Sequence, residues 1–162
     1  MSQFFTSASG LDARGVGPRI MLLTSPFLIS AIYTEWKSFE FSKISLLDRP
    51  LFSTIGWLWL SVGIVLFVSS IVQFSRNFPK GQLLTTGMFA CSRNPIYACW
   101  IVFILPAIGL ICCNWLFFLS AAVMCVVTLF MVKKEEKQLL EVFGEAYARY
   151  KQRVGCIIRF TK

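Results

Sequence analysis

The stretch SRNPIYACWIVFILPAIGLICCNWLFFLSAAVMCVVTLFMVKKEE, residues 92–136, decides the fold of this chain. Its central part, residues 94–132, has 39 consecutive residues without a charge. Because a membrane-spanning helix needs about 20 apolar residues, this part is long enough for two. Residues 112–114 (Cys-Cys-Asn) lie near its middle, so we expect a helical hairpin over residues 97–132 that turns there. Pro106 is expected to kink the first arm.

The rest of the chain adds two further apolar segments. Of its 162 residues, 56% are hydrophobic and the mean hydropathy is +0.67, which is too apolar for an ordinary soluble domain. Residues 50–75 are 26 residues without a charge and predict another span. Residues 20–34 are only 15 residues without a charge. They cross the membrane if the Arg19 side chain extends to its surface, and otherwise they form a re-entrant segment. We therefore expect an all-α, polytopic membrane helical bundle of about four spans.

We expect one membrane domain over residues 1–162. Residues 1–75 would hold a loose lead over residues 1–17 and the N-terminal spans. Residues 76–162 would hold a connecting loop, the hairpin and a C-terminal helix. The loop, residues 76–96, is rich in glycine and proline, and long loops in compact domains usually serve function.

Basic residues predict the orientation. With four spans, 13 of the 16 Lys and Arg residues share one side, which places both termini in the cytoplasm. The membrane would be a bacterial inner membrane or the endoplasmic reticulum. The net charge of +8 suits an anionic inner leaflet, so the charge does not require a nucleic acid partner.

The segment after residue 132 predicts an amphipathic helix. Its apolar positions fall on one helical face: Leu139, Phe143, Tyr147, Tyr150 and Val154. The simplest interpretation is a helix lying on anionic lipid, which suits Lys151, Arg153 and Arg159. Gly144 is expected at a close helix contact.

The sequence lacks the residue patterns that metal sites, histidine-based catalysis and soluble nucleotide-binding domains commonly use. The six cysteines show no metal-like spacing, the chain has no histidine, and no Walker or GxGxxG motif is present. We therefore expect no metal and no soluble-type nucleotide fold. Four tryptophans are interpreted as interface anchors or packing residues: Trp57, Trp59, Trp100 and Trp115.

The charges at the hairpin ends mark a candidate site. Arg93 enters the hairpin and Glu135 and Glu136 leave it, so a hairpin brings them to one side of the membrane. Adjacent residues diverge by about 100° on a helix, so at most one glutamate points into a given site. Two interpretations stay open here. The charges either bind a ligand between cytosol and bilayer, or simply pair with each other.

Two motifs resemble a known superfamily. The segment LTTGMFACSRNPIY is followed about 40 residues later by EEKQLLEVFGEAYARYKQRV. Together they resemble the isoprenylcysteine carboxyl methyltransferase and phospholipid methyltransferase superfamily over about residues 81–155. The matching positions are Leu84, Thr86-Gly87, Arg93-Asn94-Pro95-Ile96-Tyr97, Glu135-Glu136, Phe143-Gly144 and Tyr147-Ala148-Arg149-Tyr150.

The resemblance implies a membrane methyltransferase that uses S-adenosylmethionine. It implies cofactor binding by Gly87, Arg93, Asn94, Pro95, Tyr97, Glu135 and Glu136, with Arg93 and Glu136 as the catalytic pair. These residue types suit the ligand. An arginine binds a carboxylate with two parallel hydrogen bonds, a glutamate accepts from an ammonium or a diol, and an aromatic ring attracts a sulfonium.

One position departs from the superfamily pattern. Asn94 stands where the superfamily has histidine, and an amide cannot act as a base. The missing base favours an acceptor that is already ionised, a carboxylate or a thiolate. Because the site lies at the membrane, we expect this acceptor to be lipophilic, such as a prenylcysteine carboxylate. The alternatives are a phospholipid amine N-methyltransferase, a non-catalytic membrane relative, and an NADPH enzyme resembling sterol reductases.

Overall fold

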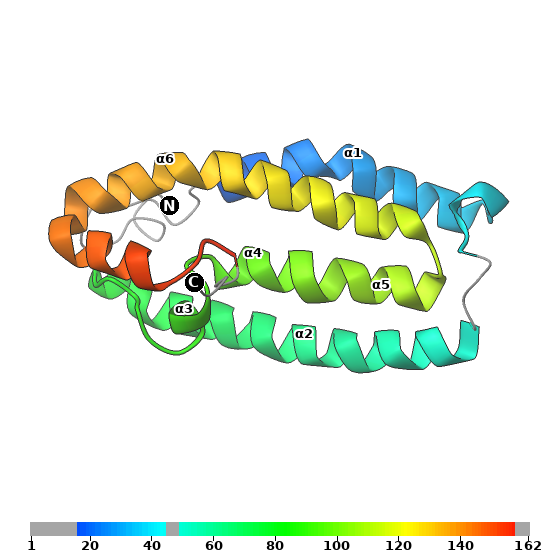
Figure 1. Cartoon of the computed structure of the whole chain (residues 1–162), viewed down its shortest axis with the longest axis horizontal. Coiled ribbons are helices and arrows are strands. Elements are labelled where there is room, and N and C mark those ends of the chain that lie inside the picture. Colours follow the sequence, from blue (N-terminus) through cyan, green and yellow to red (C-terminus); the bar gives the residue numbers. More distant parts are fainter. Residues whose placement is uncertain (1–15, 45–48, 158–162) are drawn as a thin grey trace.

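The computed structural model describes residues 16–44 and 49–157, and within these ranges it contains helices and no strands (Figure 1). The expected N-terminal lead lies almost entirely outside them, as does Arg159. The helices are α1 (Gly17–Trp36), η2 (Glu40–Ser42), α2 (Arg49–Asn77), η3 (Phe78–Lys80), α3 (Met88–Cys91), α4 (Pro95–Cys99), η4 (Trp100–Ile104), α5 (Leu105–Cys112) and α6 (Trp115–Arg153).

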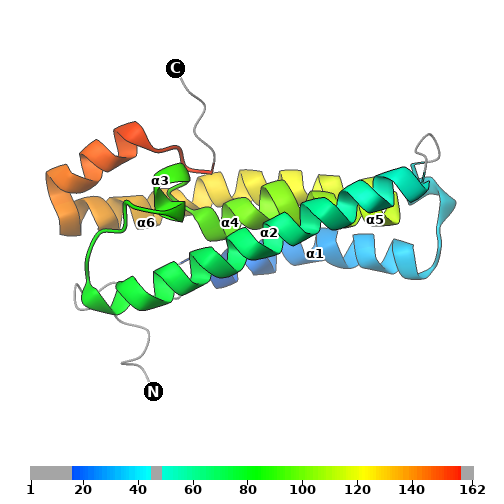
Figure 2. The same cartoon turned by 90° about the horizontal axis from the view of Figure 1, so that it is seen from below.

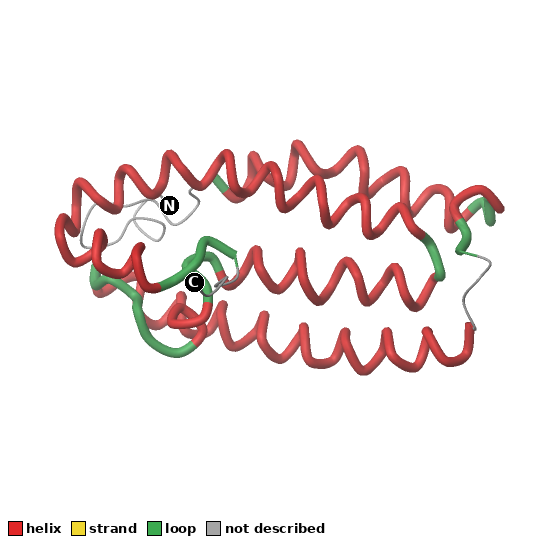
Figure 3. The backbone as a smooth tube through the Cα atoms, in the orientation of Figure 1, coloured by secondary structure: helices red, strands yellow, loops and turns green. Residues whose placement is uncertain are grey.

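The long helices lie side by side in an order that differs from the chain order. α4, η4 and α5 form one continuous rod between α2 and α6, and α1 packs on α6 (Figures 1 and 3). Helices α1 and α2 follow each other in sequence but lie in different parts of the bundle. The part of the joining segment that the structure describes, up to Ile44, lies against the turn between α5 and α6.

The expected hairpin and its turn are confirmed. α5 ends at Cys112, and Cys113 adopts a left-handed conformation with φ 49° and ψ 44°. Asn114 caps the next helix, because its side chain accepts a hydrogen bond from the Leu116 N–H at 3.0 Å. We call the end of the bundle that holds this turn the turn end, and the opposite end the Arg93 end.

The kink expected at Pro106 stays a prediction, and what the structure shows is a π-helical turn over Trp100–Ile104, shortly before Pro106. Because proline has no N–H, it cannot donate to the carbonyl of Val102 four residues earlier. The Trp59 indole of α2 donates to this carbonyl at 3.0 Å. The packing role expected for Trp59 thus includes a specific polar contact within the bundle.

Small residues bring α2 close to the hairpin. Gly56, Gly63 and Ser70, each seven residues apart, are the buried positions of α2. A Cβ added at Gly63 would lie 2.6 Å from the Phe103 Cβ. Close approach through small residues is the usual way that membrane helices gain van der Waals contact.

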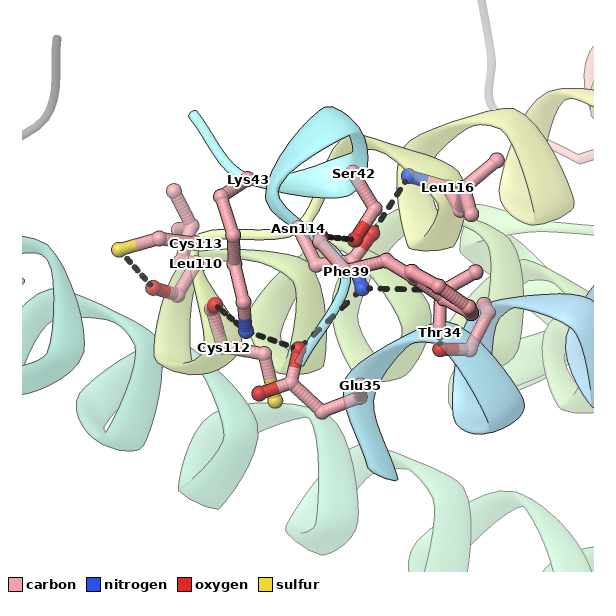
Figure 4. Close-up of polar contacts among 11 residues, drawn as sticks. Thr34, Glu35, Phe39, Ser42, Lys43, Leu110, Cys112, Cys113, Asn114 and Leu116 are labelled. Atoms are coloured by element: carbon pink, nitrogen blue, oxygen red, sulfur yellow. Dashed lines mark hydrogen bonds and ion pairs between the residues drawn. The ribbon is translucent and has the colours of Figure 1, made fainter. Parts of the chain in front are cut away.

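A polar cluster fixes the connection between α1 and α2 to the turn end (Figure 4). Lys43 forms an ion pair with Glu35, the last-turn carboxylate of α1. The Asn114 side chain, which is fully buried, donates to the same Glu35 oxygen at 3.2 Å. The Ile44 N–H donates to the Cys113 carbonyl at 2.8 Å. The loop is therefore held against the hairpin turn before α2 begins.

Within residues 16–44 and 49–157, three helices are long and apolar enough to cross a membrane: α2, the rod over Pro95–Cys112, and α6. They correspond to three of the four expected spans. α1 runs beside α6 in both views (Figures 1 and 2). Its 20 residues would extend about 30 Å as a helix. The fourth span stays a prediction.

The orientation can be tested by cysteine labelling. In a variant without the six native cysteines, Ser38→Cys at the turn end and Ser75→Cys at the Arg93 end both expose the new thiol. With both termini cytoplasmic, we expect an impermeant maleimide to label position 38 in spheroplasts and position 75 only after lysis. The reverse pattern would contradict the orientation.

Candidate active site

The C-terminal part of α6 folds back toward the hairpin. The helix continues beyond the apolar segment and turns at Gly144, which has φ 50° and ψ −129° (Figures 1 and 2). This conformation is essentially restricted to glycine. No atom lies within 4 Å of a Cβ added there, so the expectation that Gly144 marks a close helix contact is wrong. Glycine is needed for the turn itself.

The returning segment buries its apolar face against protein. Tyr147, Tyr150 and Val154 form a cluster to which Leu83, Leu139 and Phe143 add. The Tyr150 hydroxyl donates to the Phe89 carbonyl of α3 at 2.6 Å. The amphipathic pattern is confirmed, but the structure buries this face within the protein and does not leave it free to lie on lipid.

An ion-pair network forms where the hairpin begins and ends. The Arg93 Nη2 lies 2.8 Å from Glu136 Oε1, and the Lys151 Nζ lies 2.7 Å from Glu136 Oε2. The Arg93 and Glu136 side chains are only 11% and 10% exposed. Lys151 comes from the returning segment and has a protein partner that was not expected, while its side chain stays 50% exposed. The sequence carried no signal for this contact, because it depends on the turn at Gly144.

The guanidinium of Arg93 is only partly satisfied. Its Nε and Nη1 atoms are buried, and neither has a hydrogen-bond partner among the described residues. Buried donors are nearly always paired in folded proteins. The guanidinium therefore has hydrogen-bonding capacity beyond its ion pair with Glu136. The buried Tyr147 hydroxyl lies within hydrogen-bonding reach of the Arg93 guanidinium, so it is a further protein group that could accept from it.

The backbone around Arg93 is fastened to the C-terminal segment. The Arg93 N–H donates to the Gly155 carbonyl at 2.9 Å. The Ser92 hydroxyl and the Asn94 side-chain N–H donate to the Cys156 carbonyl at 3.2 and 3.1 Å. Burial raises the pKa of the Cys156 thiol, which keeps it protonated at neutral pH. Asn94 therefore helps to hold the site together, and sequence reasoning did not find this contact.

Glu135 points away from Glu136, as expected for adjacent helical residues. Its Oε1 accepts a hydrogen bond from the Val16 N–H, at the start of α1, at 2.6 Å. Tyr97 lies on the same side, because a Cβ added at Gly17 would be 3.0 Å from its hydroxyl. The structure therefore divides the predicted site residues between two sides of α6.

Gly87 and Pro95 have local backbone roles. Gly87 has φ 59°, and a Cβ there would lie 2.7 Å from the Gln73 amide. Gln73 donates to the Thr86 carbonyl at 2.6 Å and accepts from the Met88 N–H at 3.0 Å, so α2 holds the loop at this point. Pro95 is fully buried in the first turn of α4.

A cavity of about 480 Å³ lies next to the ion-pair network. Its lining combines charged and apolar residues: Arg93, Val126, Leu129, Phe130, Val132, Lys133, Glu136 and Cys156. No group of three metal-binding side chains occurs within residues 16–44 and 49–157. The charged residues in the lining of the cavity are Arg93, Lys133 and Glu136.

These features define a class: a helical membrane protein with a buried ionic site where a hairpin meets its C-terminal segment. The chain belongs to the phospholipid methyltransferase family, whose sequence model matches residues 52–146. The match runs from α2 through the hairpin to the Gly144 turn, and it confirms the resemblance. Comparison with curated proteins gives no significant match, nor does comparison with solved structures.

Neutralising Glu136 should destabilise the protein far more than neutralising an exposed glutamate. Glu136→Gln leaves the buried Arg93 charge without its partner, which costs about 3–5 kcal/mol. Glu141→Gln, at an exposed position of the same helix, should change stability by less than about 0.5 kcal/mol. Thermal unfolding in detergent micelles measures both. Equal melting temperatures for the two variants would mean that the pair contributes nothing.

Proposed function

We propose that the protein is an S-adenosylmethionine-dependent methyltransferase that acts on a lipophilic acceptor at the membrane surface. The family match supports methyl transfer. The observation that carries the cofactor assignment is the pair of unpartnered, buried donors on Arg93. These two atoms point in different directions, so each can donate a single charge-assisted hydrogen bond to an anionic group such as the cofactor's carboxylate.

In this proposal the residues have distinct roles. Arg93 contacts the cofactor, and Glu136, itself held by Lys151, positions the guanidinium. Asn94, Pro95 and Gly87 shape the backbone around it. When bound, S-adenosylmethionine supplies an activated methyl group on its sulfonium. The protein contributes alignment of the reactants and exclusion of water, which is the main source of rate for a displacement of this kind.

The acceptor is proposed to be an amphiphile of the bilayer. The family description favours a phospholipid head-group amine. A protonated amine must lose a proton before it is methylated, and both oxygens of Glu136 already bind cations. Glu135 lies on the other side of α6, where its Oε1 accepts from the Val16 N–H, so neither glutamate is placed beside Arg93 with a free oxygen for this proton. A prenylcysteine carboxylate is the second candidate, since it needs no base at neutral pH.

A methyl-transfer assay tests this proposal. Purified protein, labelled S-adenosylmethionine and either phosphatidylethanolamine or farnesylcysteine are incubated for wild type and Asn94→His. We expect wild type to methylate one of the two acceptors, and Asn94→His to give no gain. Asn94 holds Cys156, so a base at this position adds no function.

One outcome of this assay would contradict the enzymatic proposal, and another would exclude one class of acceptor. Methylation by Asn94→His alone would mean that the natural chain is a non-catalytic relative. Methylation of farnesylcysteine alone would keep the enzyme class and exclude the amine acceptor.

A further inference from the structure

We propose that the outer face of α6 binds an acyl chain of a bilayer phospholipid and that Lys133 binds its phosphate. This inference rests on the proposed function and deepens it, because it assigns the residues that select the acceptor. The cavity beside Arg93 extends along this face, away from the ion-pair network. Its two ends differ in chemistry.

The apolar end faces the bilayer. Val126, Leu129 and Phe130 line the cavity and are 52%, 43% and 65% exposed. Positions three and four apart lie on one helical face. The opposite side of α6 packs against α1 and α5. A hydrocarbon chain can therefore reach this groove from the surrounding lipid without passing between helices.

The polar end carries an excess of positive charge. Lys133 lies one turn beyond Leu129, and its Nζ is 5.3 Å from the centroid of the Phe130 ring. Glu136, the acidic residue of the lining, is already compensated by Arg93 and Lys151. The exposed Lys133 ammonium is thus a cation available to a phosphate, which lysine binds as a point charge.

The dimensions suit an amphiphile at a membrane surface. Val126 and Lys133 are seven residues apart, or about 10 Å along the helix axis. A lipid with its phosphate at Lys133 would place its chain along Phe130, Leu129 and Val126, with the head group toward Arg93. This arrangement brings the acceptor to the proposed cofactor site from the bilayer side.

Phospholipid binding can be measured without turnover. Protein in a neutral maltoside detergent is titrated with phosphatidylethanolamine, and bound lipid is counted by native mass spectrometry. We expect Leu129→Trp, which fills the groove, and Lys133→Gln, which removes its cation, each to weaken binding about tenfold. The matched controls, Leu58→Trp and Lys80→Gln, change exposed residues of α2 and η3 and should bind like wild type.

Additional measurements distinguish a failure of the groove assignment from a failure of the methyltransferase proposal. Diacylglycerol, which lacks the phosphate, should bind weakly and should not respond to Lys133→Gln. The thermal unfolding temperature should be the same in all four variants as in wild type, which shows that they are folded. If the groove variants bind phosphatidylethanolamine like the controls, or if farnesylcysteine binds in its place, the groove assignment is wrong. If phospholipid binding follows the groove residues but S-adenosylhomocysteine does not bind, the groove assignment stands and the methyltransferase proposal fails.

Discussion

The buried carboxylate of Glu136 is the constraint on which the Arg93 end depends. An uncompensated charge at this depth costs several kcal/mol, so cations must reach both of its oxygens. Arg93 comes from the start of the hairpin and Lys151 from the returning segment. The chain satisfies the carboxylate only if the hairpin closes in register and α6 turns back at Gly144. One buried charge therefore links the helix packing to the shape of the site.

The adjacent glutamates organise opposite sides of α6. Glu135 fixes the start of α1, and Glu136 fixes the loop and the returning segment. Their divergence follows from helical geometry, because successive side chains point about 100° apart. The Glu-Glu pair thus has a structural explanation that is compatible with a role in ligand binding. The Nε and Nη1 atoms of Arg93 have no hydrogen-bond partner among the described residues, and the proposed cofactor site rests on this feature.

Much of this architecture follows from local sequence rules. The uncharged length predicts the hairpin, and Asn114 predicts its turn because asparagine caps helices well. Hairpin closure predicts that Arg93 approaches the two adjacent glutamates, and the structure shows that Glu136 is the one that pairs with it. Lys151 and Asn94 could not be placed in this way. Their contacts depend on the direction of the chain after Gly144, which a single torsion angle decides and no periodicity encodes.

The central claim is that Arg93 offers its free hydrogen bonds to the methyl donor's carboxylate. Calorimetric titration with S-adenosylhomocysteine tests it in wild type, in Arg93→Ala and in Arg149→Ala, an exposed arginine of α6. Loss of a charge-assisted hydrogen bond costs about 1.5–3 kcal/mol. We therefore expect binding by wild type and Arg149→Ala, affinity about tenfold to a hundredfold lower in Arg93→Ala, and no heat with NADPH. Equal affinity in all three proteins, or binding of NADPH in place of S-adenosylhomocysteine, would contradict the claim.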